Sequence, residues 1–304
     1  MPVLPAGVRV LERGWLSSNN ILFVDGDQPA IVDSGYATHA GLTLDLVRRA
    51  FGSTRPALLV NTHLHSDHCG GNAGLQREYP AMRTLIPPGQ ADQVRAWDPV
   101  ALTFEPTGQQ CPRFSFDGVL APGSEVQLGR MRWQVHAAPG HDPHSVVLFE
   151  PGSRVLISAD ALWENGFGVV FPELEGVDAF DEVARTLDLI ERLDPTCVIP
   201  GHGAIFSDAA KALARARRRL EGYVSDPVRH ATHAAKVLLK FKLLELQSVT
   251  MPECVAWAAS TAYFGVVHER WFADVGMGAW IESLSLDLIR SGAAKLENGI
   301  LLNA

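Results

Sequence analysis

Four side chains that commonly bind metal ions stand within six consecutive positions of the sequence, namely His63, His65, Asp67 and His68. They directly follow the apolar residues 57–60, which are typical of a buried β-strand. Packing alone does not explain so many ionisable groups at a strand end, because such groups are seldom buried without partners. In an extended chain the first three would share one side and His68 would point elsewhere. The spacing therefore predicts a loop that contacts two metal ions.

Three further apolar segments end in the same way. Residues 133–136, 155–157 and 198–199 each lead to a glycine or alanine and then to one more candidate ligand; these ligands are His141, Asp160 and His202. Strand ends in α/β folds commonly face a shared crevice. We therefore expect these three side chains to complete the site that the first cluster begins.

The H-x-H-x-D-H pattern of residues 63–68 is similar to the signature of the metallo-β-lactamase superfamily, and the resemblance covers roughly residues 8–207. Asp33 and Gly35 resemble the early structural Asp-x-Gly element of that family. The resemblance implies a four-layer αββα sandwich, of mixed α/β (α+β) class, with its site at one edge of two sheets. It also implies a first metal held by His63, His65 and His141, a second held by Asp67, His68 and His202, and Asp160 as the bridge between them.

The chemistry of these ligands favours hydrolysis. Imidazoles and carboxylates suit Zn²⁺ first, and the absence of a thiolate ligand leaves iron and manganese as alternatives. Two divalent ions about 3.5 to 4 Å apart can share a water molecule and lower its pKa towards about 7. The expected enzyme is a hydrolase in which a metal-bound hydroxide attacks a small-molecule ester, thioester, lactone or related bond. Asp67 is the candidate catalytic residue that accepts a proton.

Several residues near the ligands could contact the substrate. His144 lies three positions after His141, and Trp163 and Phe167 follow Asp160 closely, so we predict substrate contacts for all three. Phe171, further along the same stretch, could line an apolar pocket together with Trp163 and Phe167. The alternative for the aromatic residues is a place in the hydrophobic core. The Asp142-Pro143 pair departs from the pattern of glyoxalase II-like relatives, which counts against a glutathione thioester. Residues 97–116 form a long irregular stretch that predicts a wall or lid over the site.

The rest of the first 207 residues alternates strand-like and helical patterns, as in a mixed α/β domain. A hairpin is expected from residues 21–24 and 30–32, with further strands at 82–86, 131–136, 146–149, 155–157 and 198–199. Helical periodicity marks residues 40–51 and 178–193, with Asp178 as a cap of the second helix.

A second domain is predicted from residue 208 to residue 304, after a catalytic domain of residues 1–207. Its sequence is rich in Ala, Leu, Lys and Arg and is mainly helical in pattern. Pro227 should end the first long helix, because proline disfavours helical geometry in the preceding residue. Asn298-Gly299 predicts a terminal hairpin. Helices followed by a hairpin suggest a winged-helix-like module, a layout that resembles an endoribonuclease branch of the superfamily, whereas glyoxalase II-like enzymes also carry helical C-terminal domains.

The charge is unevenly distributed along the chain. Residues 209–242 contain nine Lys and Arg against two acidic residues, a local charge of +7, which leaves −15 for the rest of a chain of net charge −8. Such a segment is either a solvated helix face or a contact for an acidic partner or anionic substrate. A phosphodiesterase of the endoribonuclease type is therefore the alternative function. A nucleic-acid partner is not favoured, because basic and aromatic residues do not interleave. An iron-dependent persulfide dioxygenase is a third alternative.

Composition bounds the remaining possibilities. The 304 residues are 47% hydrophobic, enough for a sizeable core. The four cysteines form no C-x-x-C pair, which favours reduced thiols. No segment has the roughly 18 uninterrupted apolar residues of a membrane helix, and the first 15 residues lack the pattern of a secretion signal. We expect a cytoplasmic protein that acts on a small molecule, without a membrane partner; association into oligomers stays open.

Overall fold

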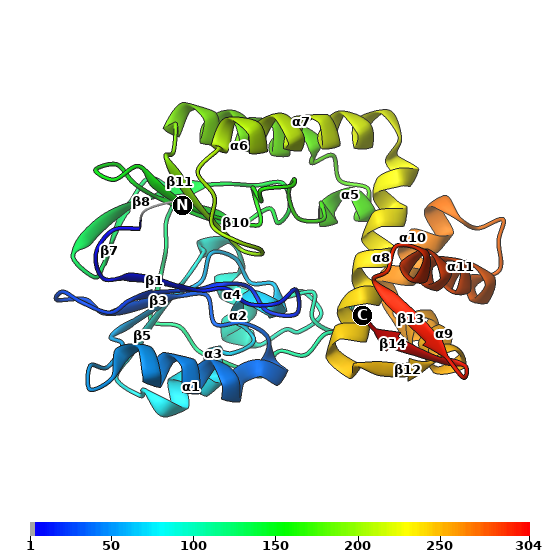
Figure 1. Ribbon diagram of the computed structural model, residues 1–304, viewed down its shortest axis with the longest axis horizontal. Coiled ribbons are helices and arrows are strands. Elements are labelled where there is room, and N and C mark those ends of the chain that lie inside the picture. The colour runs from blue at the N-terminus through cyan, green and yellow to red at the C-terminus, as the bar shows by residue number, and fades with distance from the viewer. Residues whose placement is uncertain (1–3) are drawn as a thin grey trace.

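Two β-sheets stacked face to face form the centre of the molecule in a computed structural model that describes residues 4–304 (Figure 1). The first sheet has six strands in the order of the chain: β1 (Val8–Leu11), β2 (Asn20–Phe23), β3 (Ala30–Val32), β4 (Leu58–Val60), β5 (Arg83–Ile86) and β6 (Gly118–Val119). Strands β1 to β3 pair antiparallel, and β3 to β6 pair parallel. The hairpin and the strands expected here are confirmed, whereas β1 and β6 were not expected.

The second sheet has five strands in the order β11-β10-β9-β8-β7. They are β7 (Glu125–Leu128), β8 (Met131–Ala137), β9 (Val146–Glu150), β10 (Val155–Ala159) and β11 (Cys197–Pro200). Only β10 and β11 pair parallel, so their carboxyl ends lie at the same edge of the sheet. Four of these strands match the expected segments, and β7 was not expected.

Alternation along the strands creates the layers. In β4, Leu58 and Val60 pack into the core between the sheets, while Leu59 packs under the outer helices α1 (Ala40–Phe51) and α3 (Asn72–Glu78). In the second sheet, Leu156 and other side chains pack outward against α6 (Phe180–Leu193) and α7 (Ala209–Ser225). Figure 1 shows these helices above the second sheet and α1 below the first. The predicted αββα sandwich is confirmed.

Short elements connect these layers. They are the 3₁₀ turns η1 (Ala37–His39) and η2 (Pro88–Gln90) and the helices α2 (Ser66–Cys69), α4 (Ala91–Ala96) and α5 (Phe171–Glu175). Cys69 of α2 is buried, and its Sγ lies 3.7 Å from Sγ of Cys111. All four cysteines are free thiols, as expected.

The C-terminal part begins with the long helix α8 (Pro227–Leu246), which Figure 1 shows as a column beside the open edge of the sandwich. It continues through β12 (Ser248–Thr250), α9 (Met251–Ser260), α10 (Ala262–Trp271), α11 (Met277–Arg290), β13 (Ala294–Glu297) and β14 (Ile300–Asn303). The three strands form a sheet in the order β12-β14-β13. Asn298 and Gly299, both at positive φ, close the expected hairpin. The region is mainly helical, and its winged-helix-like character stays a prediction.

The ends of two helices test the predicted breaks. Pro227 stands at the first position of α8, and the carboxylate of Asp226 accepts the amide of Arg229, so the predicted break is confirmed. The predicted cap Asp178 is wrong. The carboxylate of Glu173 instead accepts the amides of Ala179 and Phe180 at 2.6 and 2.8 Å, because α5 brings Glu173 to the start of α6.

The predicted domain boundary falls before α7. This helix packs with α6 into the core of the sandwich, and the separate C-terminal core contains residues from α8 onward together with Val169 and Leu174. The division between residues 207 and 208 therefore stays a prediction. Among residues 4–304, no helix is both long and apolar enough to cross a membrane.

Candidate metal centre

The end of β4 and the short helix α2 position the first four candidate ligands. His63 and His65 lie in the connection, and Asp67 and His68 lie in α2. Asp33, at the end of β3, holds this connection in place: its carboxylate accepts the amide of Thr62 at 2.9 Å and lies 2.8 Å from Nδ1 of His68. Asp33 therefore braces this connection through hydrogen bonds.

The other three candidates approach from the second sheet. His141 follows β8, Asp160 follows β10 and His202 follows β11. Gly201, just before His202, passes so close to Asp160 that a Cβ atom there would clash with Oδ1 of that carboxylate. A glycine is therefore required where the end of β11 approaches the site.

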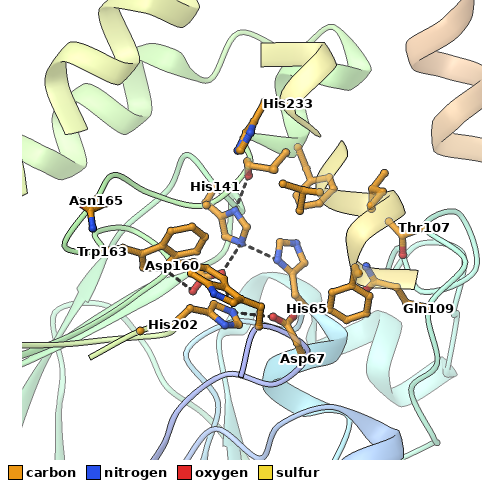
Figure 2. Close-up of a pocket in the computed structure, with 18 of the residues that line it drawn as sticks. His65, Asp67, Thr107, Gln109, His141, Asp160, Trp163, Asn165, His202 and His233 are labelled. Carbon is orange, nitrogen blue, oxygen red and sulfur yellow. Dashed lines mark hydrogen bonds and ion pairs between the residues drawn. The ribbon is translucent and has the colours of Figure 1, made fainter. Parts of the chain in front are cut away.

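The seven side chains gather into two groups whose ligand atoms lie within 4.8 Å of one another. One group contains His63, His65 and His141, and the other contains Asp67, His68, Asp160 and His202. Asp160 also faces the first group, because its two carboxylate oxygens lie 3.5 Å from Nε2 of His68 and 3.5 Å from Nε2 of His141. Figure 2 shows five of these residues converging from different elements.

The donor atoms fit metal ions. Nε2 of His63 and Nε2 of His68 are buried and have no hydrogen-bond partner. Nδ1 of His65 lies 2.8 Å from Nε2 of His141, so two ring nitrogens face each other. A buried polar atom without a partner costs about 1 to 3 kcal/mol. Divalent metal ions coordinated by these nitrogens would remove that cost.

The electrostatics of the site agree with the same interpretation. Burial, with the neighbouring His68, holds the pKa of His63 well below its usual value, and burial lowers the pKa of His65 to about 4. Burial opposes a charged Asp160, but His68 and His202 outweigh it and hold the pKa of Asp160 well below its usual value. Neutral imidazoles and ionised carboxylates are the forms that bind metals.

Without a metal ion, His68 carries the positive charge that balances the neighbouring carboxylates. Burial disfavours its charged form, yet the carboxylates of Asp160, Asp33 and Asp67 outweigh burial and raise the pKa of His68 well above its usual value. The three carboxylates thus create a strong preference for positive charge at this point. A divalent cation at the centre satisfies the same preference.

Hydrogen bonds from outside the two groups fix the orientation of the ligands. Nδ1 of His141 contacts the carbonyl of Val169 at 2.5 Å. The indole of Trp163 donates to Oδ1 of Asp160 at 3.1 Å. Such contacts determine which ring nitrogen faces a metal ion and keep the carboxylate from rotating.

A cavity of about 520 Å³ opens over the two groups. His65, Asp67, His141, Asp160 and His202 form its floor, and most of its remaining wall is apolar. Thr103, Thr107 and Gln109 line one side, while Leu102 and Phe104 from the same stretch are buried in a neighbouring core. The expected wall from residues 97–116 is therefore present. The other side is formed by α8 of the C-terminal part.

The predicted substrate contacts have different outcomes. Trp163 lines the cavity, as expected. Phe167 does not: it is 2% exposed and packs against Tyr223 in the core under α7. Phe171 lines the cavity, as expected, and lies edge-on to His65. His144 packs against Gly89 and, in the part of the chain that the structure describes, does not line this cavity.

Several cavity residues were not found from the sequence. Trp15 stacks on the ring of His202, with 5.2 Å between centroids and 9° between planes. Arg219, His233 and Phe241 line the cavity from α7 and α8. The only sequence signal for these last residues was the positive charge of segment 209–242, which does not indicate the side of a helix that faces the site.

Comparison with known proteins supports the resemblance seen in the sequence. The model of the metallo-β-lactamase superfamily matches residues 13–202. Acyl-coenzyme A thioesterase MBLAC2 of Bos taurus is 27% identical over 213 residues, covering 64% of this chain and 76% of that protein. A hydroxyacylglutathione hydrolase of Anaeromyxobacter dehalogenans is 31% identical over 194 residues, covering 64% of each chain.

The structural comparison extends to the C-terminal part. A crystal structure of a metallo-β-lactamase family protein from Thermus thermophilus superposes with a TM-score of 0.58 at 17% identity, covering 99% of this chain and 100% of that one. At this identity the likeness concerns the fold alone. With the family match, the sandwich and the two ligand groups together, the chain belongs to the metallo-β-lactamase superfamily.

Proposed function

We propose that this protein hydrolyses a small-molecule thioester with the help of two divalent metal ions. The observation that carries the proposal is the pair of ligand groups at the floor of a largely apolar cavity of about 520 Å³, a size that suits a small molecule. Thioesters are chosen among the expected esters, thioesters and lactones because the names of two relatives describe thioester substrates.

The residues divide between the two ions as the family resemblance implies. His63, His65 and His141 would hold one ion; Asp67, His68 and His202 would hold the other; Asp160 would bridge them. When bound, the ions supply an acidified water molecule and polarise the thioester carbonyl. The donor set suits zinc, and also iron or manganese.

Asp67 is the residue that we assign to proton transfer. Burial raises the pKa of its carboxyl, but His68 and His202 outweigh burial and lower it, so the group is an acceptor. Its Oδ2 lies 3.0 Å from Nε2 of His202. As the new C–O bond forms and the C–S bond breaks, Asp67 takes a proton from the attacking water and then passes it to the departing thiolate, giving a carboxylic acid and a thiol and restoring the carboxylate.

Aromatic side chains flank the metal ligands in the cavity wall. Phe171 lies edge-on to both His65 and His141, and Trp15 covers His202. An apolar wall lowers the local dielectric constant and so strengthens the electrostatic interactions at the floor of the cavity.

Elemental analysis combined with a substrate panel tests the proposal. The panel contains a thioester, an ester, a lactone, a phosphodiester and a β-lactam. We expect bound divalent metal and thioester hydrolysis in the unchanged protein, and loss of both in His63→Ala. His268→Ala on α10 is the matched control and should retain both. Purified protein without metal, or with turnover of the phosphodiester alone, would contradict the proposal.

A further inference from the structure

One cation in the cavity wall has no partner. Arg219 of α7 lines the cavity above the metal ligands, and within residues 4–304 its guanidinium makes no ion pair and no hydrogen bond. Arg217, two positions earlier on the same helix, instead pairs with Asp188 and Glu191 at 2.8 and 2.9 Å. Arg219 is half-buried, so its guanidinium keeps free N–H donors that face the cavity.

The position of Arg219 is fixed by the loop that follows Asp160. A Cβ atom at Gly166 would lie 2.6 Å from both Cζ and Nη1 of Arg219, so the guanidinium packs directly on this glycine. Gly166 has φ of 118°, a conformation that favours glycine, and its carbonyl accepts the amide of Trp163 at 2.7 Å. The same short loop therefore holds Arg219 and carries Trp163, which contacts Asp160.

A histidine lines the cavity from the neighbouring helix. Figure 2 shows His233 on the α8 side of the cavity, beyond His141 as seen from Asp67 and His202. Burial, then the charges of Arg219, Lys236 and Arg229, lower the pKa of His233 to about 4. The imidazole is therefore neutral at pH 7 and stands in a field of positive charge, where it can donate one N–H to an anion.

Five of the other eight cations of the basic segment have partners in the described chain, namely Arg215, Arg217, Lys236, Lys240 and Lys242. Lys240 donates to the carbonyls of Ala293 and Ala304, Lys242 pairs with Glu245, and Lys236 lies 3.6 Å from Asp287. Arg219 is the member of this segment that lines the metal cavity and keeps its hydrogen-bonding capacity free.

We propose that Arg219 and His233 form a binding subsite for a carboxylate or phosphate group of the substrate. A guanidinium binds either group through two parallel hydrogen bonds, and the neutral imidazole adds one more. The inference rests on the proposed thioesterase function and narrows its substrates to thioesters of anionic thiols.

The shape of the cavity assigns the anion to the thiol part. A second cavity of about 350 Å³ adjoins this one. The two share Trp15, His233 and Phe241, and the other residues that line the second cavity include Leu244 and Leu288 but also Lys236 and Lys240. Most of the surface that lines the second cavity is nevertheless apolar, which suits an uncharged acyl chain. The thiol part of the substrate then lies on the side of the cavity that Arg219 lines.

Three butyryl thioesters test the subsite: those of coenzyme A, which carries phosphates, of glutathione, which carries carboxylates, and of the neutral N-acetylcysteamine. Arg219→Met should raise KM at least about tenfold for an anionic thioester, leave kcat within about twofold, and leave the neutral thioester unchanged, since a hydrogen bond to a charged group contributes about 1.5 to 3 kcal/mol. Arg217→Met is the matched control and should leave KM and kcat unchanged for all three thioesters. Arg219→Lys should recover part of the loss, because it restores the charge without the planar fork. A lower KM for the coenzyme A thioester would identify phosphate as the group that the subsite binds, and a lower KM for the glutathione thioester would identify carboxylate.

Binding measured without hydrolysis separates this inference from the proposed function. Calorimetry uses the thioethers S-butyl-coenzyme A, S-butylglutathione and S-butyl-N-acetylcysteamine. Tighter binding of an anionic thioether that Arg219→Met weakens supports the subsite, even if no thioester is hydrolysed and the proposed function fails. Hydrolysis of all three thioesters with equal KM, unchanged in Arg219→Met, would overturn the subsite and leave the proposed function standing.

Discussion

Oδ2 of Asp33 lies 2.8 Å from Nδ1 of His68, and both side chains are buried. The contact joins the end of β3 to α2 and leaves Nε2 of His68 directed at Asp160. Asp33→Asn removes the negative charge that makes this imidazole a stronger ligand. We expect metal affinity to fall about 10- to 100-fold, measured by competition with a chelator of known affinity. Asp45→Asn, at an exposed position, is the control and should bind metal as tightly as the unchanged protein. Equal metal affinities for the Asp33 and Asp45 variants would refute the role of Asp33.

The indole of Trp163 fixes one oxygen of the bridging candidate Asp160 at 3.1 Å. Trp163→Phe keeps an aromatic wall but removes the donor. We expect about a tenfold loss of affinity for one of two metal equivalents, because a hydrogen bond to a carboxylate contributes about 1.5 to 3 kcal/mol. Stepwise metal titration followed by calorimetry is the measurement. Trp271→Phe, in the C-terminal part, serves as control, and two unchanged binding steps in Trp163→Phe would argue against this role.

A buried carboxylate fastens α8 to the sandwich. Glu245 accepts hydrogen bonds from Tyr36 at 3.1 Å and Gln110 at 2.5 Å and pairs with Lys242 at 3.1 Å. Glu245→Ala leaves three polar groups without this partner. We expect the free energy of unfolding to fall by about 1 to 3 kcal/mol and hydrogen exchange in α8 to accelerate. Glu269→Ala, exposed on α10, should alter neither; the same exchange rates in both variants would show that Glu245 does not fasten the helix.

The pH dependence of stability should report on His230. Burial lowers the pKa of this side chain to about 4, and its Nε2 accepts the amide of Val170 at 3.1 Å. The unfolded chain, with a pKa near 6.5, therefore binds a proton that the folded chain does not between pH 6.5 and 4. The stability that His230 contributes is present above pH 6.5 and falls as the pH drops through this window, by at most about 3 kcal/mol.

His230→Gln isolates this contribution from those of the other histidines. Urea denaturation at pH 7 and pH 5 should show a smaller loss of stability in His230→Gln than in the unchanged protein. His268→Gln should lose as much as the unchanged protein. An identical pH dependence in all three proteins would show that His230 takes up its proton equally in the folded and unfolded states.

Much of the fold could be predicted because its signals are local. A short uninterrupted apolar run identifies strands such as β4, and a period near 3.6 identifies α1 with its observed bounds. Short strands such as β1 and β12 could not be predicted, because few of their side chains are fully buried. They are defined by hydrogen bonding to the neighbouring strands, which the local sequence does not show. The cap of α6 could not be predicted for a related reason: Glu173 lies at the start of α6 only because of where α5 packs.

By itself, the sequence determined the candidate ligands and the elements that carry them, because seven ionisable residues at strand ends follow from residue type and spacing. The tertiary structure alone decided the shape and charge of the space above them. Trp15, Arg219 and Phe241 meet there from segments about 20 to 200 positions apart, and the path of one loop put Phe171 rather than Phe167 in the wall. Such choices depend on helix packing and chain direction, which act between segments that no local pattern connects.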